Sequence, residues 1–385
     1  MVATVVVEGA VVVTRRLSLL VALAVISAEG AVLPEDRADL LYHAYSGGGV
    51  EITGPSLLVR KDIADEISVV ANYYVDMVSS ASIDVVTTAS PYTEERTQYS
   101  LAVDYLHDRT TVSMGYISST ENDYDAQTAS FSISQDFFGD LTTVTIGYAK
   151  GDDIVRRNGQ SDFQENVTRQ NYQLSVTQIL TRNMLVNVAG EVITDEGFLN
   201  NPYRSVRYLD PTTPLGYGFQ AERYPRTRTS NAVSVTLKYF LPYRAALKFK
   251  GKLYSDTWGI DANSVEVGYT HPYDDHLTFD VSARYYQQDS AEFYADLFPY
   301  QDAQNFLARD KELSTFQSVS VGVGASYQWK VHWGPVSRVS FNAKYDRIQF
   351  RYDDFRNLTV QTTPGAEPLY SFDADVVRLF VSLWY

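Results

Sequence analysis

The stretch DVVRLFVSLWY, residues 375–385, alternates between two sets of side chains. One face of an extended strand would carry Val377, Leu379, Val381, Leu383 and Tyr385, and the other Val376, Arg378, Phe380, Ser382 and Trp384. An exposed strand with one apolar face promotes edge-to-edge aggregation unless both of its edges are paired. The stretch therefore predicts a strand inside a closed β-barrel, which has no free edge.

The same alternation recurs after residue 36, in segments of about ten residues that are typical of a membrane-spanning barrel. In ALKFKGKLY, residues 246–254, Leu247, Phe249 and Leu253 alternate with lysines. A soluble sandwich would bury its apolar faces against a second sheet and would not need so many such segments in succession. We therefore expect an all-β, antiparallel transmembrane β-barrel.

Connections between these segments alternate in length. The short ones are DIAD, HDRT, FFGD, TRN, LPYRA, HPYDD and KVHWGP, and the long ones cover residues 78–96, 149–168, 193–230, 287–314 and 347–372. Bacterial outer-membrane barrels have short periplasmic turns and long extracellular loops. The pattern predicts about sixteen strands, within a range of fourteen to eighteen.

Composition agrees with an exported membrane barrel. The 385-residue chain has no cysteine and a net charge of −15, which disfavours nucleic-acid binding because phosphate contacts need a basic surface. Arg15 and Arg16 precede the apolar run LSLLVALAVISA, so we expect a signal peptide at residues 1–30, with an upstream extension of the true start. Residues 31–385 are then a single barrel domain in the outer membrane of a Gram-negative bacterium.

The terminal strand has a second expected role. The alternating residues Leu379, Val381, Leu383 and Tyr385 resemble the carboxy-terminal signal by which the barrel-assembly machinery recognises its clients. We therefore expect that machinery as a partner during assembly. Outer-membrane lipid and lipopolysaccharide are the expected partners of the finished barrel.

Charged residues occupy the strand faces opposite the apolar ones and are expected to point into the lumen. The set comprises Glu191, Lys238, Lys248, Lys250, Lys252, Glu266, Asp280 and Arg284, with Lys344 and Arg378 farther along the chain. One interpretation is a charged constriction that selects permeating ions or small solutes. The other is a lumen cross-braced by ion pairs, which would conduct poorly or not at all.

The longest expected loop is rich in arginine although the protein is acidic. It carries Arg204, Arg207, Arg223, Arg226 and Arg228. These residues could form a selectivity element in the pore mouth or a docking surface for an anionic group. Alternatively, they pair with lipopolysaccharide phosphates or with acidic loops, such as the acidic stretch at 287–316.

Catalytic, metal and cofactor sites are not expected. The acidic stretch ENDYDA, residues 121–126, could bind a divalent cation, but its spacing does not match a calcium loop. An outer-membrane hydrolase would need Ser, His and a carboxylate together on the outer side, and only His43 is expected near that position. We therefore expect a protein that is not an enzyme.

Several stretches together resemble a known family. They are LLVRKDI (57–63), SASIDVVTTASPYTEER (80–96), GFLNNPYRSVRY (197–208), AERYPRTRTSN (221–231), YSDTWGIDANS (254–264) and YYQQDSAEFY (285–294). The family that they resemble comprises proteobacterial outer-membrane proteins of about this length, classed as a domain of unknown function. The resemblance implies gene neighbours that encode a small lipoprotein, a thioredoxin-like protein and a flavin transferase. It therefore implies a membrane-embedded role in an exported redox or lipoprotein system.

Two functions of different kinds follow as expectations. The first is a porin-like channel for ions or small solutes, with the inward charges setting selectivity. The second is a non-conducting structural or partner-binding barrel that holds a lipoprotein or a component of an exported redox system. Whether the long loops plug the lumen distinguishes them.

Overall fold

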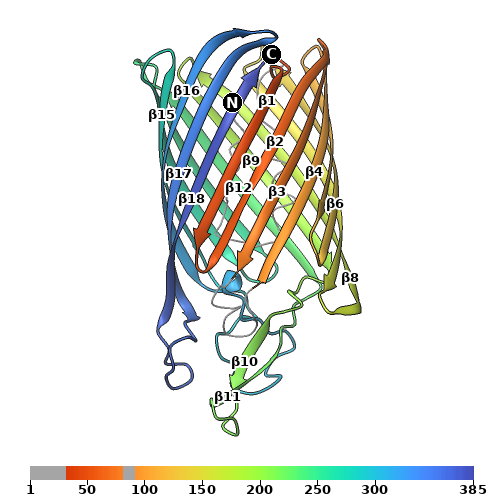
Figure 1. Cartoon of the computed structure of the whole chain (residues 1–385), viewed down its shortest axis with the longest axis vertical. Coiled ribbons are helices and arrows are strands. Elements are labelled where there is room, and N and C mark those ends of the chain that lie inside the picture. The colour runs from red at the N-terminus through yellow and green to blue at the C-terminus, as the bar shows by residue number, and fades with distance from the viewer. Residues whose placement is uncertain (1–31, 81–91) are drawn as a thin grey trace.

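A computed structural model describes residues 32–80 and 92–385. Sixteen strands form one closed barrel (Figure 1), and a separate two-stranded hairpin lies in a loop. The predicted fold class and strand number are confirmed. The predicted signal peptide at residues 1–30 lies outside the described residues.

The barrel strands follow one another around the wall in chain order, and all neighbouring pairs are antiparallel. They are β1 (Arg37–Gly47), β2 (Val50–Ala64), β3 (Ile67–Ser80), β4 (Tyr92–His107), β5 (Thr110–Thr120), β6 (Tyr124–Phe137), β7 (Thr142–Arg157), β8 (Gln160–Thr181), β9 (Met184–Gly197), β12 (Thr227–Phe240), β13 (Ala246–Asp256), β14 (Asp261–Pro272), β15 (Leu277–Gln288), β16 (Phe316–Trp333), β17 (Val336–Arg356) and β18 (Leu369–Trp384). The hairpin consists of β10 (Ser205–Leu209) and β11 (Tyr217–Ala221), and a 3-10 helix, η1, covers Lys311–Leu313.

The terminal stretch closes the barrel. Strand β18 pairs with β17 on one edge and with β1 on the other, with Arg37 opposite Trp384. Leu379 is 48% exposed on the outer face, whereas Ser382 is buried on the inner face. Because both edges are paired, the apolar strand has no exposed hydrogen-bonding groups to promote aggregation. The strand predicted from residues 375–385 is thus confirmed.

The outward face changes from apolar to polar toward the outer end of strands such as β7 and β15. On β7 the exposed residues run from Ile146 through Tyr148 to Asp152, and on β15 from Val281 through Tyr285 to Gln287. Tyrosine prefers the boundary between lipid and water. This ring of tyrosines therefore marks the outer boundary of the apolar band, and the strands continue beyond it with polar outward residues.

The two ends of the barrel differ in their connections. The end that holds the start of β1 and the end of β18 has short turns, whereas β10 and β11 project from the opposite, outer end (Figure 1). The β1–β2 turn also lies at the outer end and uses Gly48 and Gly49, both with positive φ. Two consecutive residues of this kind suit a tight hairpin whose twist matches that of its strands. Long outer connections lie at the expected ranges 193–230, 287–314 and 347–372, although β17 and β18 occupy both ends of the last range. Most of the expected loop at 78–96 lies outside the described residues.

The expected long loop at 149–168 is instead a continuation of the wall. Strand β7 extends to Arg157 and β8 begins at Gln160. Val155 and Val167 are buried together on the inner face, so the alternation continues beyond the membrane boundary. The polar outward residues of this region made it resemble a loop in sequence.

Candidate functional site

A strip of basic side chains covers part of the inner wall. Lys248, Lys250 and Lys252 lie on the face of β13 opposite the exposed Phe249 and Leu253. Successive inward residues of a strand are separated by about 7 Å, so the lysines form a ladder along the barrel. The Lys248 side chain remains 36% exposed.

Neighbouring strands add further charges to this ladder. Lys238 of β12 lies opposite Lys248, and Glu266 of β14 lies opposite both Lys250 and Arg284. The Lys248 ammonium contacts Glu266 Oε1 at 2.8 Å. Cations therefore outnumber carboxylates along this part of the wall, and we call β12–β15 with these inward charges the basic strip.

The remaining predicted lumen acids have local hydrogen-bond partners. Thr270 Oγ1 donates to Asp280 Oδ1 at 2.6 Å, and Asn171 Nδ2 donates to Glu191 Oε1 at 2.6 Å. The structure places the predicted lumen charges from Glu191 to Arg284 on the inner face of β9 and β12–β15, and Lys344 and Arg378 on β17 and β18. Their role in selectivity remains a prediction.

On the adjacent wall, Arg378 forms an ion pair with Asp346, and Lys344 lies 3.7 Å from the same residue. A side chain at Gly322 of β16 would overlap the Asp346 carboxylate. The absence of a side chain at this inward position therefore makes room for the carboxylate.

The five predicted loop arginines all pair with carboxylates of the protein itself. The pairs are Arg204 with Asp310, Arg207 with Asp296 and Glu367, Arg223 with Asp302, Arg226 with Glu165, and Arg228 with Asp256. Of the interpretations considered from sequence, pairing with acidic segments is the one that the structure shows. Three loops, residues 198–226, 289–315 and 357–368, are joined in this way at the outer end, and we call them the cap (Figure 1).

Arg207 occupies the centre of the cap. It is fully buried, and its Nη1 contacts Glu367 Oε1 at 2.6 Å, while Nε donates to the carbonyl oxygen of Asp296 at 2.9 Å. Arg309 also reaches Asp296, with 2.9 Å between Nη2 and Oδ1. Because buried carboxylates need charged partners, these two arginines and two acids form one mutually dependent group.

An apolar cluster supports the cap from the barrel rim. Trp258, which follows β13, contacts the Tyr224 and Phe293 rings edge-on, with centroid distances of 5.5 and 5.2 Å. Beside it lies the buried carboxylate of Glu222, which accepts hydrogen bonds from the Tyr224 hydroxyl at 2.5 Å and the Arg309 backbone at 2.8 Å. Burial, reinforced by the charge of Asp310, raises the pKa of Glu222 to about 7.

A second apolar cluster lies inside the outer end of the wall. Tyr45 of β1, Phe316 of β16 and Phe350 of β17 are buried together, and all lie on inward faces. Aromatic side chains therefore narrow the interior on the side formed by β1–β3 and β16–β18. The basic strip lies on a different part of the wall.

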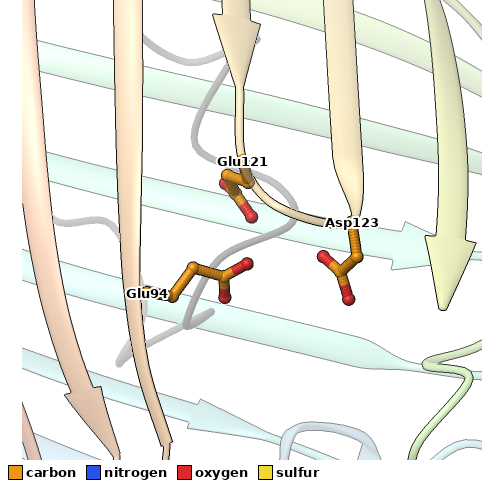
Figure 2. Close-up of side chains that lie close together, drawn as sticks. All are labelled: Glu94, Glu121 and Asp123. Atoms are coloured by element: carbon orange, nitrogen blue, oxygen red, sulfur yellow. The ribbon is translucent and has the colours of Figure 1, made fainter. Parts of the chain in front are cut away.

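Three carboxylates meet near the outer ends of β4–β6. Figure 2 shows Glu94, Glu121 and Asp123 turned toward one another, and their ligand-type oxygens lie within 4.8 Å. Arg96 Nε lies 3.8 Å from Glu121 Oε1 and offsets part of their charge. Sequence reasoning selected Glu121 and Asp123 within ENDYDA but missed Glu94, because only strand pairing brings β4 to this position.

His43 lies on the inner face of β1, four residues before the end of the strand at the first outer turn. Its Nε2 contacts Asp76 Oδ1 at 2.7 Å, and its ring stacks on Tyr74. Asp76 in turn lies 3.5 Å from Arg96. This network braces the inner wall between β1 and β4.

A closed antiparallel wall with an apolar outer face and a charged inner face defines a β-barrel of the bacterial outer-membrane type. The chain belongs to the family described as "Protein of unknown function (DUF3570)", whose model matches residues 83–349. The family resemblance inferred from loop and strand-end stretches is thus confirmed. No curated protein matches the chain significantly.

Several solved outer-membrane structures are similar to this chain at low sequence identity. A bacterial polysaccharide outer membrane secretin matches with a TM-score of 0.50 at 10% identity, over 92% of this chain and 100% of that one. OmpT of Vibrio cholerae, in a loop-deletion form, matches at 0.41 and 10% identity, over 91% and 98%. The siderophore receptor PirA from Pseudomonas aeruginosa matches at 0.41 and 11%, over 91% of this chain and 63% of the receptor. The secretin match shows that the barrel has a fold found in bacterial outer-membrane proteins.

Proposed function

We propose that this protein is a porin-like channel of the outer membrane that conducts ions or small solutes along the basic strip. The observation that carries the proposal is the ladder of Lys248, Lys250 and Lys252, of which Lys248 remains over a third exposed within the barrel wall. Rings or rows of one charge sign select the opposite ion by raising its local concentration. The excess of cations on β12–β15 favours anions.

The cap and the inner aromatic cluster give the passage its proposed shape. Phe316 and Phe350 fill the interior on the β16–β18 side, and the cap gathers at the outer end. A solute would then pass beside the cap and along β12–β15. Such a path is narrower than the whole barrel, so the proposed conductance is small.

Changing the three lysines of β13 to glutamine tests this proposal. Reversal potentials in planar bilayers with a salt gradient should shift from anion preference toward cation preference, because the local positive charge is removed. The matched control is Lys150→Gln, since Lys150 faces outward on β7 and pairs with Asp152 at 3.1 Å. Equal reversal potentials for all three proteins would contradict the assignment of the basic strip.

The second candidate is a non-conducting barrel that holds an exported lipoprotein or redox partner. The observation that favours it is the cap, whose buried Arg207, Asp296 and Glu367 join three outer loops. A barrel that stays silent in bilayers, even after Arg207→Met loosens the cap, would support this function over the channel.

A further inference from the structure

A groove of about 550 Å³ lies on the outward face of β12–β16, near the outer ends of these strands. Its volume falls within the range of about 300–1,000 Å³ that is usual for small-ligand sites. The groove lies outside the barrel, so it belongs neither to the basic strip nor to the cap interior.

The lining of the groove changes from apolar to polar along the strand direction. Val233, Leu253 and Tyr285 form its membrane side, and Leu253 is 66% exposed. Each of these three strands contributes a second lining residue, two positions closer to the outer end. These residues are Asn231, Ser255 and Gln287. The groove therefore crosses the ring of tyrosines and is continuous with the lipid-facing wall. A ligand that fills the groove must therefore have an apolar part at the membrane side and a polar part toward the outer end.

The polar part offers both donors and acceptors. The Tyr285 hydroxyl donates to the amide oxygens of Gln287 and Gln317, at 2.9 and 3.2 Å. Within the described part of the chain, neither amide NH₂ group has a hydrogen-bond partner, so both can donate to a ligand. Exposed carboxylates that line the same groove, Asp261, Asp289 and Asp353, can accept from hydroxyl groups.

We propose that this groove binds the saccharide head group of an outer-leaflet glycolipid, with the acyl chains along Val233 and Leu253. Sugar hydroxyls both donate and accept, which suits a lining of amides and carboxylates. The three carboxylates repel phosphate, so we place the phosphate groups of such a glycolipid outside the groove and assign its recognition to the sugar hydroxyls. The inference rests on the outer-membrane location in the proposed function, but not on conduction.

Native mass spectrometry of the purified full-length barrel with lipid A tests the site. Lipid A should be retained through detergent removal, with phosphatidylethanolamine and phosphatidylglycerol retained at least about tenfold less. Changing Gln287 and Gln317 to leucine should lower lipid A retention about tenfold, because two hydrogen bonds are lost while side-chain size is kept. Conductance should stay unchanged, so failure here is distinct from failure of the channel.

A matched control exists on β8, which is separated from β12 by β9 and lies outside the groove. Gln170 of β8 accepts from the hydroxyls of Tyr148 and Tyr172, at 3.2 and 2.9 Å, and thus repeats the arrangement at the same boundary outside the groove. Gln170→Leu should leave lipid A retention unchanged. A loss equal to that of the groove variant would overturn the proposal, because it would indicate a general lipid annulus.

Two further outcomes would also overturn the proposal, and both use the unchanged protein. Phospholipids that displace lipid A at equal concentration would show that the head group is not recognised. A deacylated lipid A disaccharide that binds as tightly as lipid A would show a soluble-sugar site in place of a glycolipid site.

Discussion

The guanidinium group of Arg207 contacts carboxylates from two other loops and has no exposed surface. Arg223 lies in the same loop and pairs with Asp302, but its side chain is 49% exposed. Solvent screens the exposed pair, whereas removal of one partner from the buried group leaves uncompensated charges. The two arginines therefore provide a direct comparison of buried and exposed ion pairs within one loop.

We predict that Arg207→Met destabilises the cap by about 3–5 kcal/mol, because Asp296 and Glu367 remain buried without their main cation. Arg223→Met should cost about 0–1 kcal/mol. Hydrogen exchange in residues 198–226 and 289–315 measures both effects. Similar exchange rates in the two variants would contradict the central position given to Arg207.

Gly54 of β2 lies at a position where a larger residue would not fit. A side chain at this position of β2 would overlap the carbonyl oxygen of Val75 in β3, and the backbone cannot easily move away. Gly251 of β13 has no atom within 4 Å of the corresponding position. The two strand glycines therefore differ in the space around them.

Gly54→Ala should reduce the yield of folded barrel severalfold, because the β2–β3 pairing must shift to admit the new methyl group. Gly251→Ala should fold like the unchanged protein. The heat-modifiable band on gel electrophoresis measures the folded fraction. Normal folding of the Gly54 variant would show that the wall at this point adapts more than the structure implies.

At the scale of elements, the cap loop that precedes β12 contains a titratable carboxylate. Glu222 is surrounded by the Tyr224 hydroxyl, the Arg309 backbone amide, the Asp310 carboxylate and the Arg204 guanidinium. Its pKa is raised from 4.5 to about 7, first by burial and then by Asp310. A carboxyl group with a raised pKa in the folded state stabilises that state most at low pH.

The cap should therefore lose stability as the pH rises from about 4.5 through about 7, since folding then requires burial of a charged Glu222. Fluorescence of Trp258, which packs on Tyr224, and hydrogen exchange of the cap report the change. Glu222→Gln should abolish this part of the pH dependence. An unchanged pH profile in that variant would assign the titration to another group.

For the individual strands, the sequence predicted the features that depend only on the alternation of apolar and polar residues. Leu379 and Val381, for example, identified the outward face of β18. Alternation could not mark where β7 and β8 leave the membrane, because polar outward residues such as Asp152 look the same in a loop and in a strand above the lipid. The prediction of a loop at 149–168 was wrong for this reason.

Across the whole molecule, contacts between distant segments were the part that the sequence left undetermined. It identified the five loop arginines and an acidic counterpart, but Arg207 pairs with Glu367, which lies in a third loop. Glu94 likewise joins Glu121 only because β4 pairs with β5. Such pairings depend on three-dimensional proximity that local spacing does not encode.

The barrel as a whole combines an apolar outer wall, an inner basic strip and a cap of buried ion pairs. The apolar outer wall is typical of an outer-membrane barrel. The basic strip and the cap are the basis for the proposed narrow, anion-preferring path. The net charge of −15 would by itself favour cations. Selectivity in bilayers therefore separates the local effect of the basic strip from the overall charge of the protein.

The most direct measurement is the single-channel conductance of the unchanged, refolded barrel in planar bilayers, with the reversal potential taken across a salt gradient. The account predicts small, discrete conductance steps and a reversal potential on the anion-selective side. Silence from a correctly folded, heat-modifiable barrel, or a cation-selective reversal potential, would contradict the proposed channel.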